Sequence, residues 1–183
     1  MKPRHIGLSP GAAKRAPAAV ARAYADIEAQ LPGLRAASAV TCPTRPGCNA
    51  CCRSDFPVYV EELVALVPHI SPAAWERVRR NASHMVERAT GTPCPLLGED
   101  GGCEVYEHRP AVCRAHAVTT APELCGTPME IGVVQIAHPA WASMLVARVG
   151  ALLRRTPTDH LHFYPSLRRL AAYFPGGNRD GHD

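Results

Sequence analysis

The fold of this chain is decided by two stretches, Cys48-Asn49-Ala50-Cys51-Cys52 and Cys103-Glu104-Val105-Tyr106-Glu107-His108-Arg109-Pro110-Ala111-Val112-Cys113-Arg114. They belong to one cysteine-rich segment, and the rest of the chain contains no cysteine. The eight cysteines are Cys42, Cys48, Cys51, Cys52, Cys94, Cys103, Cys113 and Cys125. Chance would not gather them in this way, so we expect them to share one role.

The spacing of these cysteines predicts metal ligation. Cys48 and Cys51 are separated by two residues, which lets one turn direct two thiolates at a single metal ion or cluster. The side chains of the neighbours Cys51 and Cys52 diverge, so they do not easily serve the same small ion. We therefore predict that all eight cysteines are metal ligands and that they form more than one centre.

Cysteine has two other common roles in proteins, as a small buried apolar residue and as a disulfide partner. A single residue such as Cys42 or Cys125 would also suit a small buried apolar site. Eight cysteines could form disulfides, but residues 1–15 contain no apolar run typical of a signal peptide. We therefore expect a cytoplasmic protein, and thiols stay reduced in that compartment.

Composition and charge exclude some classes of partner. The net charge of +4 comes from 20 basic and 16 acidic residues, and no basic patch alternates with aromatic side chains. No window approaches about 18 consecutive apolar residues. We expect neither a nucleic-acid partner nor a membrane partner, and the partners predicted are metal ions and a peptide or protein.

The first half of the chain predicts helices around the first cysteine stretch. Apolar residues at a spacing of three or four predict a helix over 12–31 that ends at Pro32-Gly33. Residues 56–60 are expected to be extended and 61–67 helical. Ser71 as N-cap and Pro72 at the first helical position predict a helix that continues to Thr90, before Gly91.

The second half adds a turn-rich segment and further helices. The turn at 100–102 predicts an irregular hairpin or knuckle within 94–106, and Pro110 begins a short helix that carries Cys113. A strand is expected over 131–136. Two more helices are predicted over 139–155 and 166–174, the first with an apolar face made of Trp141, Met144, Leu145, Val149 and Leu152.

These elements predict a mainly α fold with small irregular or β-hairpin elements. We expect a single helical domain, 1–174, wrapped around a cysteine-rich metal-binding core, 42–125. The tail, 175–183, is rich in glycine and charge and is expected to be disordered.

The cysteine motifs resemble a known family. Cys48-x-x-Cys51-Cys52, then Cys94-Pro95-x-Leu97, then Cys103-x-x-Tyr106-Glu107-x-Arg109-Pro110-x-x-Cys113-Arg114 is similar to the bacterial YkgJ-type cysteine-cluster proteins, described as zinc- or iron-chelating. The resemblance covers roughly residues 42–116. Cys42 stands further from Cys48 than the corresponding cysteine of that family does.

Three residues around Cys113 are expected to assist the metal centre as cofactor-binding residues. Arg109 and Arg114 would offset the negative charge of gathered thiolates and donate hydrogen bonds to sulfur or to loop carbonyls. The alternatives are that Arg109 anchors a turn and that Arg114 is a solvated side chain. Tyr106 is expected to pack there with its hydroxyl bonded nearby. His108 and His116 are alternative ligands.

The sequence leaves the metal and its use open. Eight cysteines could fill two tetrahedral zinc sites or hold iron–sulfur clusters. The long segment between Cys52 and Cys94 and the all-cysteine ligation favour iron–sulfur, as [4Fe-4S]. The first hypothesis is redox chemistry or modification of a peptide or protein, because the resemblance implies such roles, flagellin lysine methylation among them. The alternative is a structural zinc module that binds a partner.

Overall fold

The structure is a computed structural model that describes residues 8–43, 49, 51–52, 56–81, 93–119, 139–155 and 160–173. The described part is mainly helical, as predicted. Its helices are α1 (Pro10–Ala36), α2 (Val60–Leu66), η2 (Val67–His69), α3 (Pro72–Arg80), η3 (Tyr106–His108), α4 (Ala111–Ala115), α5 (Ala140–Leu152) and α6 (Phe163–Ala171). Its strands are β1 (Cys42–Pro43), β2 (Pro57–Tyr59), β3 (Ala117–Val118) and β4 (His160–His162).

The strands form two small antiparallel pairs that join distant parts of the chain. β1 pairs with β3, with Cys42 opposite Val118, and β2 pairs with β4, with Val58 opposite Leu161. The extended segment predicted over 56–60 is β2, and the helix predicted after it is α2 with η2. The pairing of β2 with β4 brings α6 beside α2.

The long helix α1 begins as the sequence chemistry requires and ends later than predicted. The Ser9 hydroxyl caps it by accepting the Ala12 N–H at 3.2 Å. Pro32 lies inside the helix, which continues to Ala36, so the predicted end at Pro32-Gly33 is wrong. The last turn still closes, because the Ala37 N–H reaches the Gly33 carbonyl at 3.0 Å.

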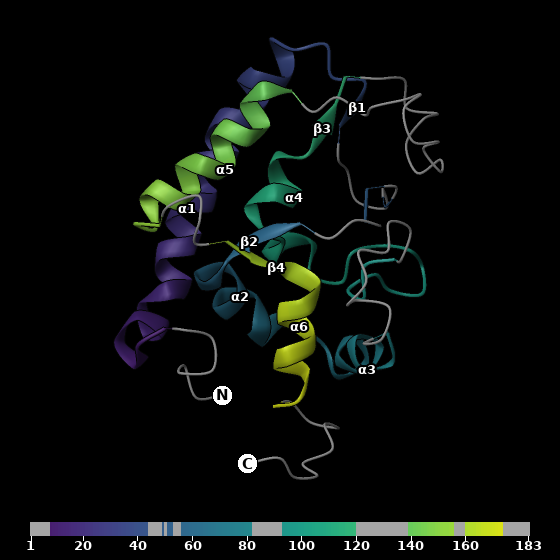
Figure 1. The fold of residues 1–183 in the computed structure, drawn as a ribbon. Helices are drawn as coiled ribbons and strands as arrows, with labels where there is room; N and C mark the ends of the chain where they lie inside the picture. Colours follow the sequence, from purple (N-terminus) through teal and green to yellow (C-terminus); the bar gives the residue numbers. More distant parts are fainter. Residues whose placement is uncertain are drawn as a thin grey trace.

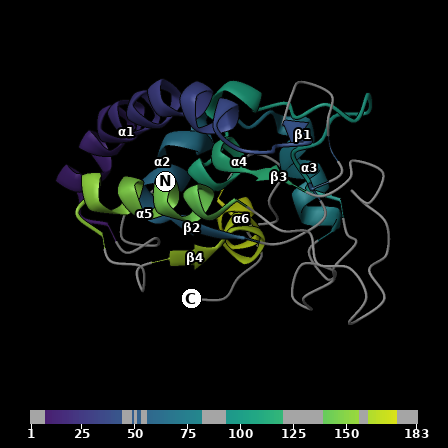
Figure 2. The same ribbon diagram turned by 90° about the horizontal axis from the view of Figure 1, so that it is seen from above.

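Two hydrophobic clusters form the core. The first lies between α2, η2, α3 and α6 and includes Leu96 and Val105 from the cysteine-rich segment. The second lies between α1, α4 and α5, which Figures 1 and 2 show side by side, and includes Tyr59. Cys94 and Cys103 pack against the first cluster. The site is therefore built on the side of a hydrophobic core.

The remaining helices agree with the prediction in part. Ser71 caps α3 by accepting the Ala74 N–H at 3.0 Å, and α3 ends at Arg80, while 82–90 lie outside the described residues. In α5 the predicted apolar face is wrong at Met144 and Leu152, which are 63% and 51% exposed. Ala142 is buried instead, since the face toward α1 and α4 is centred on 141, 145 and 149. The predicted strand at 131–136 and the tail lie outside the described residues.

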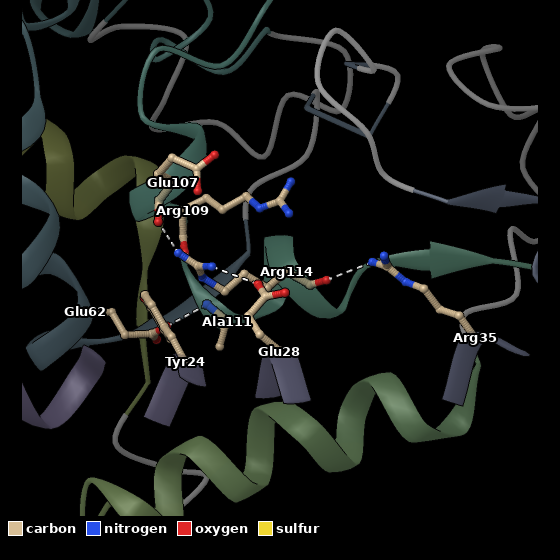
Figure 3. A network of polar contacts seen from close by, with 8 residues as sticks. All are labelled: Tyr24, Glu28, Arg35, Glu62, Glu107, Arg109, Ala111 and Arg114. Atoms are coloured by element: carbon tan, nitrogen blue, oxygen red, sulfur yellow. Dashed lines mark hydrogen bonds and ion pairs between the residues drawn. The ribbon is translucent and has the colours of Figure 1, made fainter. Parts of the chain in front are cut away.

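One buried carboxylate joins three helices. Glu62 of α2 is 2% exposed and accepts three hydrogen bonds: from the Tyr24 hydroxyl at 2.9 Å, the Tyr59 N–H at 2.9 Å and the Ala111 N–H at 2.7 Å. Figure 3 shows this carboxylate between α1 and the start of α4. Burial raises the pKa of Glu62, and the hydrogen bonds from Ala111, Tyr59 and Tyr24 oppose that shift. The position of α4 therefore depends on Glu62.

Helix α5 and strand β2 approach each other closely at Gly150, which has no side chain. A Cβ on Gly150 would lie 2.6 Å from the Cζ atom of Tyr59, with the hydroxyl closer still. Tyr59 is 1% exposed and cannot swing into solvent. Only glycine therefore fits at this point of α5.

Glu62→Gln tests the carboxylate. The amide keeps the shape but places an N–H₂ group against backbone donors, so we expect a loss of about 1–3 kcal/mol in the free energy of unfolding. Urea denaturation measures it. Tyr24→Phe is the control, since it removes one donor and leaves the two backbone contacts. A Glu62→Gln loss no larger than that of Tyr24→Phe would contradict the role assigned to Glu62.

Gly150→Ala tests the close approach. Alanine in a helix gains up to about 1 kcal/mol over glycine, but here the clash with Tyr59 should produce a net loss of about 1–3 kcal/mol. Gly33→Ala in α1 is the matched control, because nothing lies within 4 Å of the added Cβ. Thermal unfolding should show Tm falling for the first variant and not for the second. Equal behaviour of the two would contradict the packing.

Candidate metal centre

A tight turn brings Cys94 and Cys103 into one knuckle. Leu97 and Cys103 form an isolated antiparallel bridge, and the Gly98 N–H donates to the Gly102 carbonyl at 2.8 Å. Gly101 has a φ of +75°, which favours glycine. The predicted hairpin or knuckle is confirmed.

Backbone hydrogen bonds join the first cysteine stretch to this knuckle. The Cys94 N–H donates to the Cys52 carbonyl at 2.7 Å, and the Asn49 side-chain amide donates to the Gly101 carbonyl at 2.9 Å. The Cys52 N–H in turn donates to the Asn49 carbonyl at 2.9 Å. Residues that are far apart in the sequence therefore meet at one place.

Four cysteine sulfurs gather there: those of Cys52, Cys94, Cys103 and Cys113. Burial raises the pKa of the Cys94 thiol to about 12, with smaller contributions from the charges of Cys52 and Cys103. Burial likewise raises the pKa of Cys113 well above its ordinary value, followed by the charges of Cys94, Cys52 and Cys103. The pKa of Cys103 is also raised, first by burial. Each thiolate therefore raises the cost of charging the others.

The geometry and oxidation state of these thiols can be described further. Within the described ranges, no three His, Cys, Asp or Glu side chains form a group that could hold one metal ion. Cys94, Cys103 and Cys113 are free thiols, so the disulfide alternative is wrong for these three. All four of the gathered cysteines are half-buried. The four residues therefore keep partial contact with solvent.

Of the other four predicted ligands, two lie within the described residues. Cys51 is exposed, and Cys42 lies in β1. Cys48 and Cys125 lie outside the described residues. The divergence expected between the neighbours Cys51 and Cys52 agrees with their different exposure.

Arg109 supplies positive charge beside the thiols. Its guanidinium lies over the ring of Tyr106, 3.8 Å from the ring centre, and its Nε is buried without a hydrogen-bond partner. Its charge lowers the pKa of both Cys103 and Cys113, against the larger effect of burial. In Figure 3 its side chain extends away from the contacts around Arg114. Arg109 is therefore a cation placed to interact with the cysteine sulfurs.

Arg114 has a different place, since its guanidinium attaches the site loop to α1. It donates from Nε to the Arg109 carbonyl at 2.9 Å, from Nη2 to the Glu107 carbonyl, and from Nη1 to the Glu28 carboxylate at 2.8 Å (Figure 3). It also lies over the Tyr24 ring, 4.2 Å from its centre. At 7% exposure it is not the solvated side chain of the alternative interpretation.

Two further residues complete the surroundings. The His108 ring stacks on His69 with centres 3.4 Å apart, and burial followed by the charge of His69 lowers the pKa of His108. Tyr164 of α6, which the sequence motifs do not include, belongs to the hydrophobic cluster against which Cys94 packs, and burial followed by the charge of Cys94 raises the pKa of its hydroxyl. The helical pattern of 163–171 could have indicated that Tyr164 is buried, but no motif could have indicated that it lies near Cys94.

Comparison with known families identifies the site segment. Residues 41–130 match the family model described as "CxxCxxCC: Putative zinc- or iron-chelating domain". This match agrees with the family resemblance that the cysteine motifs indicated. Comparisons with curated proteins and with solved structures found no match. Among the helices described, none combines the length and the apolar character needed to cross a membrane.

Arg114→Met tests the attachment of the site loop. The change removes the donors to the Glu107 and Arg109 carbonyls, and we expect a loss of about 2–4 kcal/mol in the free energy of unfolding. Because Glu28 is half exposed, the ion pair itself contributes little. Urea denaturation measures the loss. Arg22→Met on the exposed face of α1 is the control, and a similar effect of both variants would contradict the role of Arg114.

Proposed function

We propose that this chain is a cysteine-ligated metal protein in which Cys52, Cys94, Cys103 and Cys113 hold an iron–sulfur cluster, [4Fe-4S]. The family supports metal binding through cysteine, by zinc or iron chelation. The observation that carries the choice of ligands is the gathering of these four sulfurs, from two distant stretches, beside one arginine.

The sequence supports the choice of a cluster over a zinc ion. The long segment between Cys52 and Cys94 and the all-cysteine ligation are less typical of a compact zinc ribbon. The positive charge of Arg109 suits either centre, because four thiolates leave both a zinc ion and a [4Fe-4S] cluster anionic overall.

The surrounding residues have defined tasks in this proposal. Because burial disfavours isolated thiolates, the four sulfurs become charged only together with a cation, and metal binding releases protons. Arg109 and the backbone donors of the knuckle offset the remaining charge. Arg114 holds the loop in place, and Tyr106 holds the Arg109 guanidinium. A bound cluster would supply one-electron transfer.

The same proposal extends to the other cysteines and to the whole chain. The sequence pattern supports a further centre with ligands among Cys42, Cys48, Cys51 and Cys125, because the neighbours Cys51 and Cys52 do not easily serve one small ion. The chain acts in the cytoplasm as one domain over 1–174. Its role is redox chemistry or the modification of a peptide or protein, which half-buried sulfurs at the side of the core would permit.

Anaerobic purification tests the metal. We expect a brown protein that absorbs near 400 nm and contains iron and acid-labile sulfide. A colourless protein with stoichiometric zinc would overturn the iron–sulfur proposal and favour the structural zinc module. Purification in air is the wrong experiment, because zinc can refill a cluster site after oxidation.

Replacement of single cysteines by serine tests the ligands. Cys94→Ser and Cys113→Ser should each remove most of the iron of one centre, since serine is a poor substitute for a thiolate ligand. Cys51→Ser is the matched variant and should leave that centre intact while it affects the second. Iron and sulfide analysis with electron paramagnetic resonance of the reduced protein separates the two centres. Full iron content in both Cys94→Ser and Cys113→Ser would show that the ligands are wrongly assigned.

A further inference from the structure

Arg77 of α3 joins the two cysteine-bearing arms of the knuckle. Its Nε atom donates a hydrogen bond to the Pro95 carbonyl at 3.0 Å, and its Nη2 atom donates to the Glu104 carboxylate. Pro95 directly follows Cys94 in the chain, and Glu104 directly follows Cys103. One guanidinium group therefore contacts the chain immediately after each of two proposed ligands.

A second contact fixes the carboxylate that Arg77 reaches. The Ser71 hydroxyl donates to the other carboxylate oxygen of Glu104 at 2.7 Å. The same hydroxyl oxygen accepts the Ala74 N–H as the cap of α3, so its own position is fixed by the helix. The Glu104 side chain is therefore held at both oxygens, and the arm that carries Cys103 is attached to α3.

Arg77 extends the backbone pairing of the knuckle. The two arms pair at the bridge between Leu97 and Cys103, and the Glu104 N–H donates to the Leu96 carbonyl at 3.0 Å. Arg77 adds a link one residue further from the turn, between Pro95 and Glu104. This is the end of the knuckle at which the chain reaches Cys94.

The chemistry of the Arg77 side chain suits a link of this kind. A guanidinium is planar and presents its donors at fixed angles, so two acceptors that it binds are held at a defined separation. The side chains of Arg77 and Glu104 are 21% and 29% exposed, and an ion pair with that much contact with water adds little to the free energy of unfolding. The main effect of Arg77 is therefore on the geometry of the knuckle.

We propose that Arg77 is a positioning residue of the metal centre: it holds the chain beside Cys94 and Cys103, so that the two sulfurs are spaced for the metal before the metal binds. This inference rests on the proposed function of both cysteines as ligands. Ordering a loose arm at the moment of binding would cost conformational entropy. Partners that orient ligands without touching the metal strongly affect metal affinity for this reason.

Arg77→Met in the full-length, anaerobically prepared protein tests the proposal. Methionine keeps an unbranched side chain and removes every donor. Transfer of the bound metal to excess 4-(2-pyridylazo)resorcinol, a chelator that takes up iron and zinc, is followed by absorbance. We expect transfer about tenfold faster than in the wild type, the lower end of the effect of such partners on metal affinity. Arg79→Met is the matched control on α3, because Arg79 contacts Glu76 and the Ala171 carbonyl, and its rate should be unchanged.

Two comparisons separate positioning from stability and from charge. Urea denaturation of both methionine variants shows how much stability each has lost, and an acceleration in Arg77→Met that its loss of stability accounts for, as in Arg79→Met, overturns the proposal. Arg77→Lys keeps the charge but offers one compact donor group in place of the planar guanidinium. We expect its transfer rate to lie close to that of Arg77→Met. The wild-type rate in either variant of Arg77 overturns the proposal.

Glu104→Gln keeps the test valid if Arg77→Met does not fold. The amide keeps the shape of the side chain but weakens the contacts with Arg77 and Ser71, so metal transfer should again be faster than in the wild type. Glu99→Gln, an exposed carboxylate of the same knuckle, is the matched control and should leave the rate unchanged. Equal rates in these two variants overturn the proposal.

Failure of the proposed function would be visible separately. Because the chelator takes up either metal, a wild type that contains zinc in place of a cluster is tested in the same way. Full metal content in both Cys94→Ser and Cys103→Ser would overturn the assignment of ligands, and this inference with it. If both serine variants lose metal while Arg77→Met transfers it at the wild-type rate, only the role of Arg77 is overturned.

Discussion

The structure depends on the buried carboxylate of Glu62. Three donors from α1, β2 and α4 converge on it, and together they fix where α4 begins. Because α4 carries Cys113, the position of one predicted ligand is set by a contact in the middle of the fold. A carboxylate in this position is costly to bury, and only full hydrogen bonding makes it tolerable. The same constraint explains why α4 can be as short as Ala111–Ala115 and still be well placed.

The two arginines near Cys113 have different roles, which the sequence alone does not distinguish. Arg114 points into the protein and attaches the loop through the carbonyls of 107 and 109 to α1. Arg109 points the other way and brings positive charge to Cys103 and Cys113. The backbone of Arg109 takes part in the first task, since its carbonyl is one of the two acceptors. The buried guanidinium of Arg114 therefore helps to hold the positive charge of Arg109 near the cysteine sulfurs.

The helices and the family could be predicted because they depend on local signals. Ser71 and Pro72 determine the start of α3 through one cap, and the knuckle follows from a glycine that adopts a positive φ. Pro32 misled the prediction, since packing along α1 outweighed the loss of one backbone donor. Met144 and Leu152 were assigned to a buried face because the sequence does not show which helices cover α5. The gathering of four of the eight sulfurs, and the position of Tyr164 near Cys94, depend on tertiary packing that the spacing of residues does not show.

The site and the core are physically linked. Cys94 and Cys103 pack against the first hydrophobic cluster, so the surroundings that raise their pKa are the same side chains that stabilise the fold. A cation bound to these thiolates relieves the cost of charging them, whereas the metal-free site must keep them protonated. Metal binding should therefore stabilise the packing of α3 and α6 around the knuckle, because a ligand that binds the folded state stabilises it by mass action. It follows that α6, although it lies outside the cysteine-rich segment, is coupled to the knuckle through the hydrophobic core that both share.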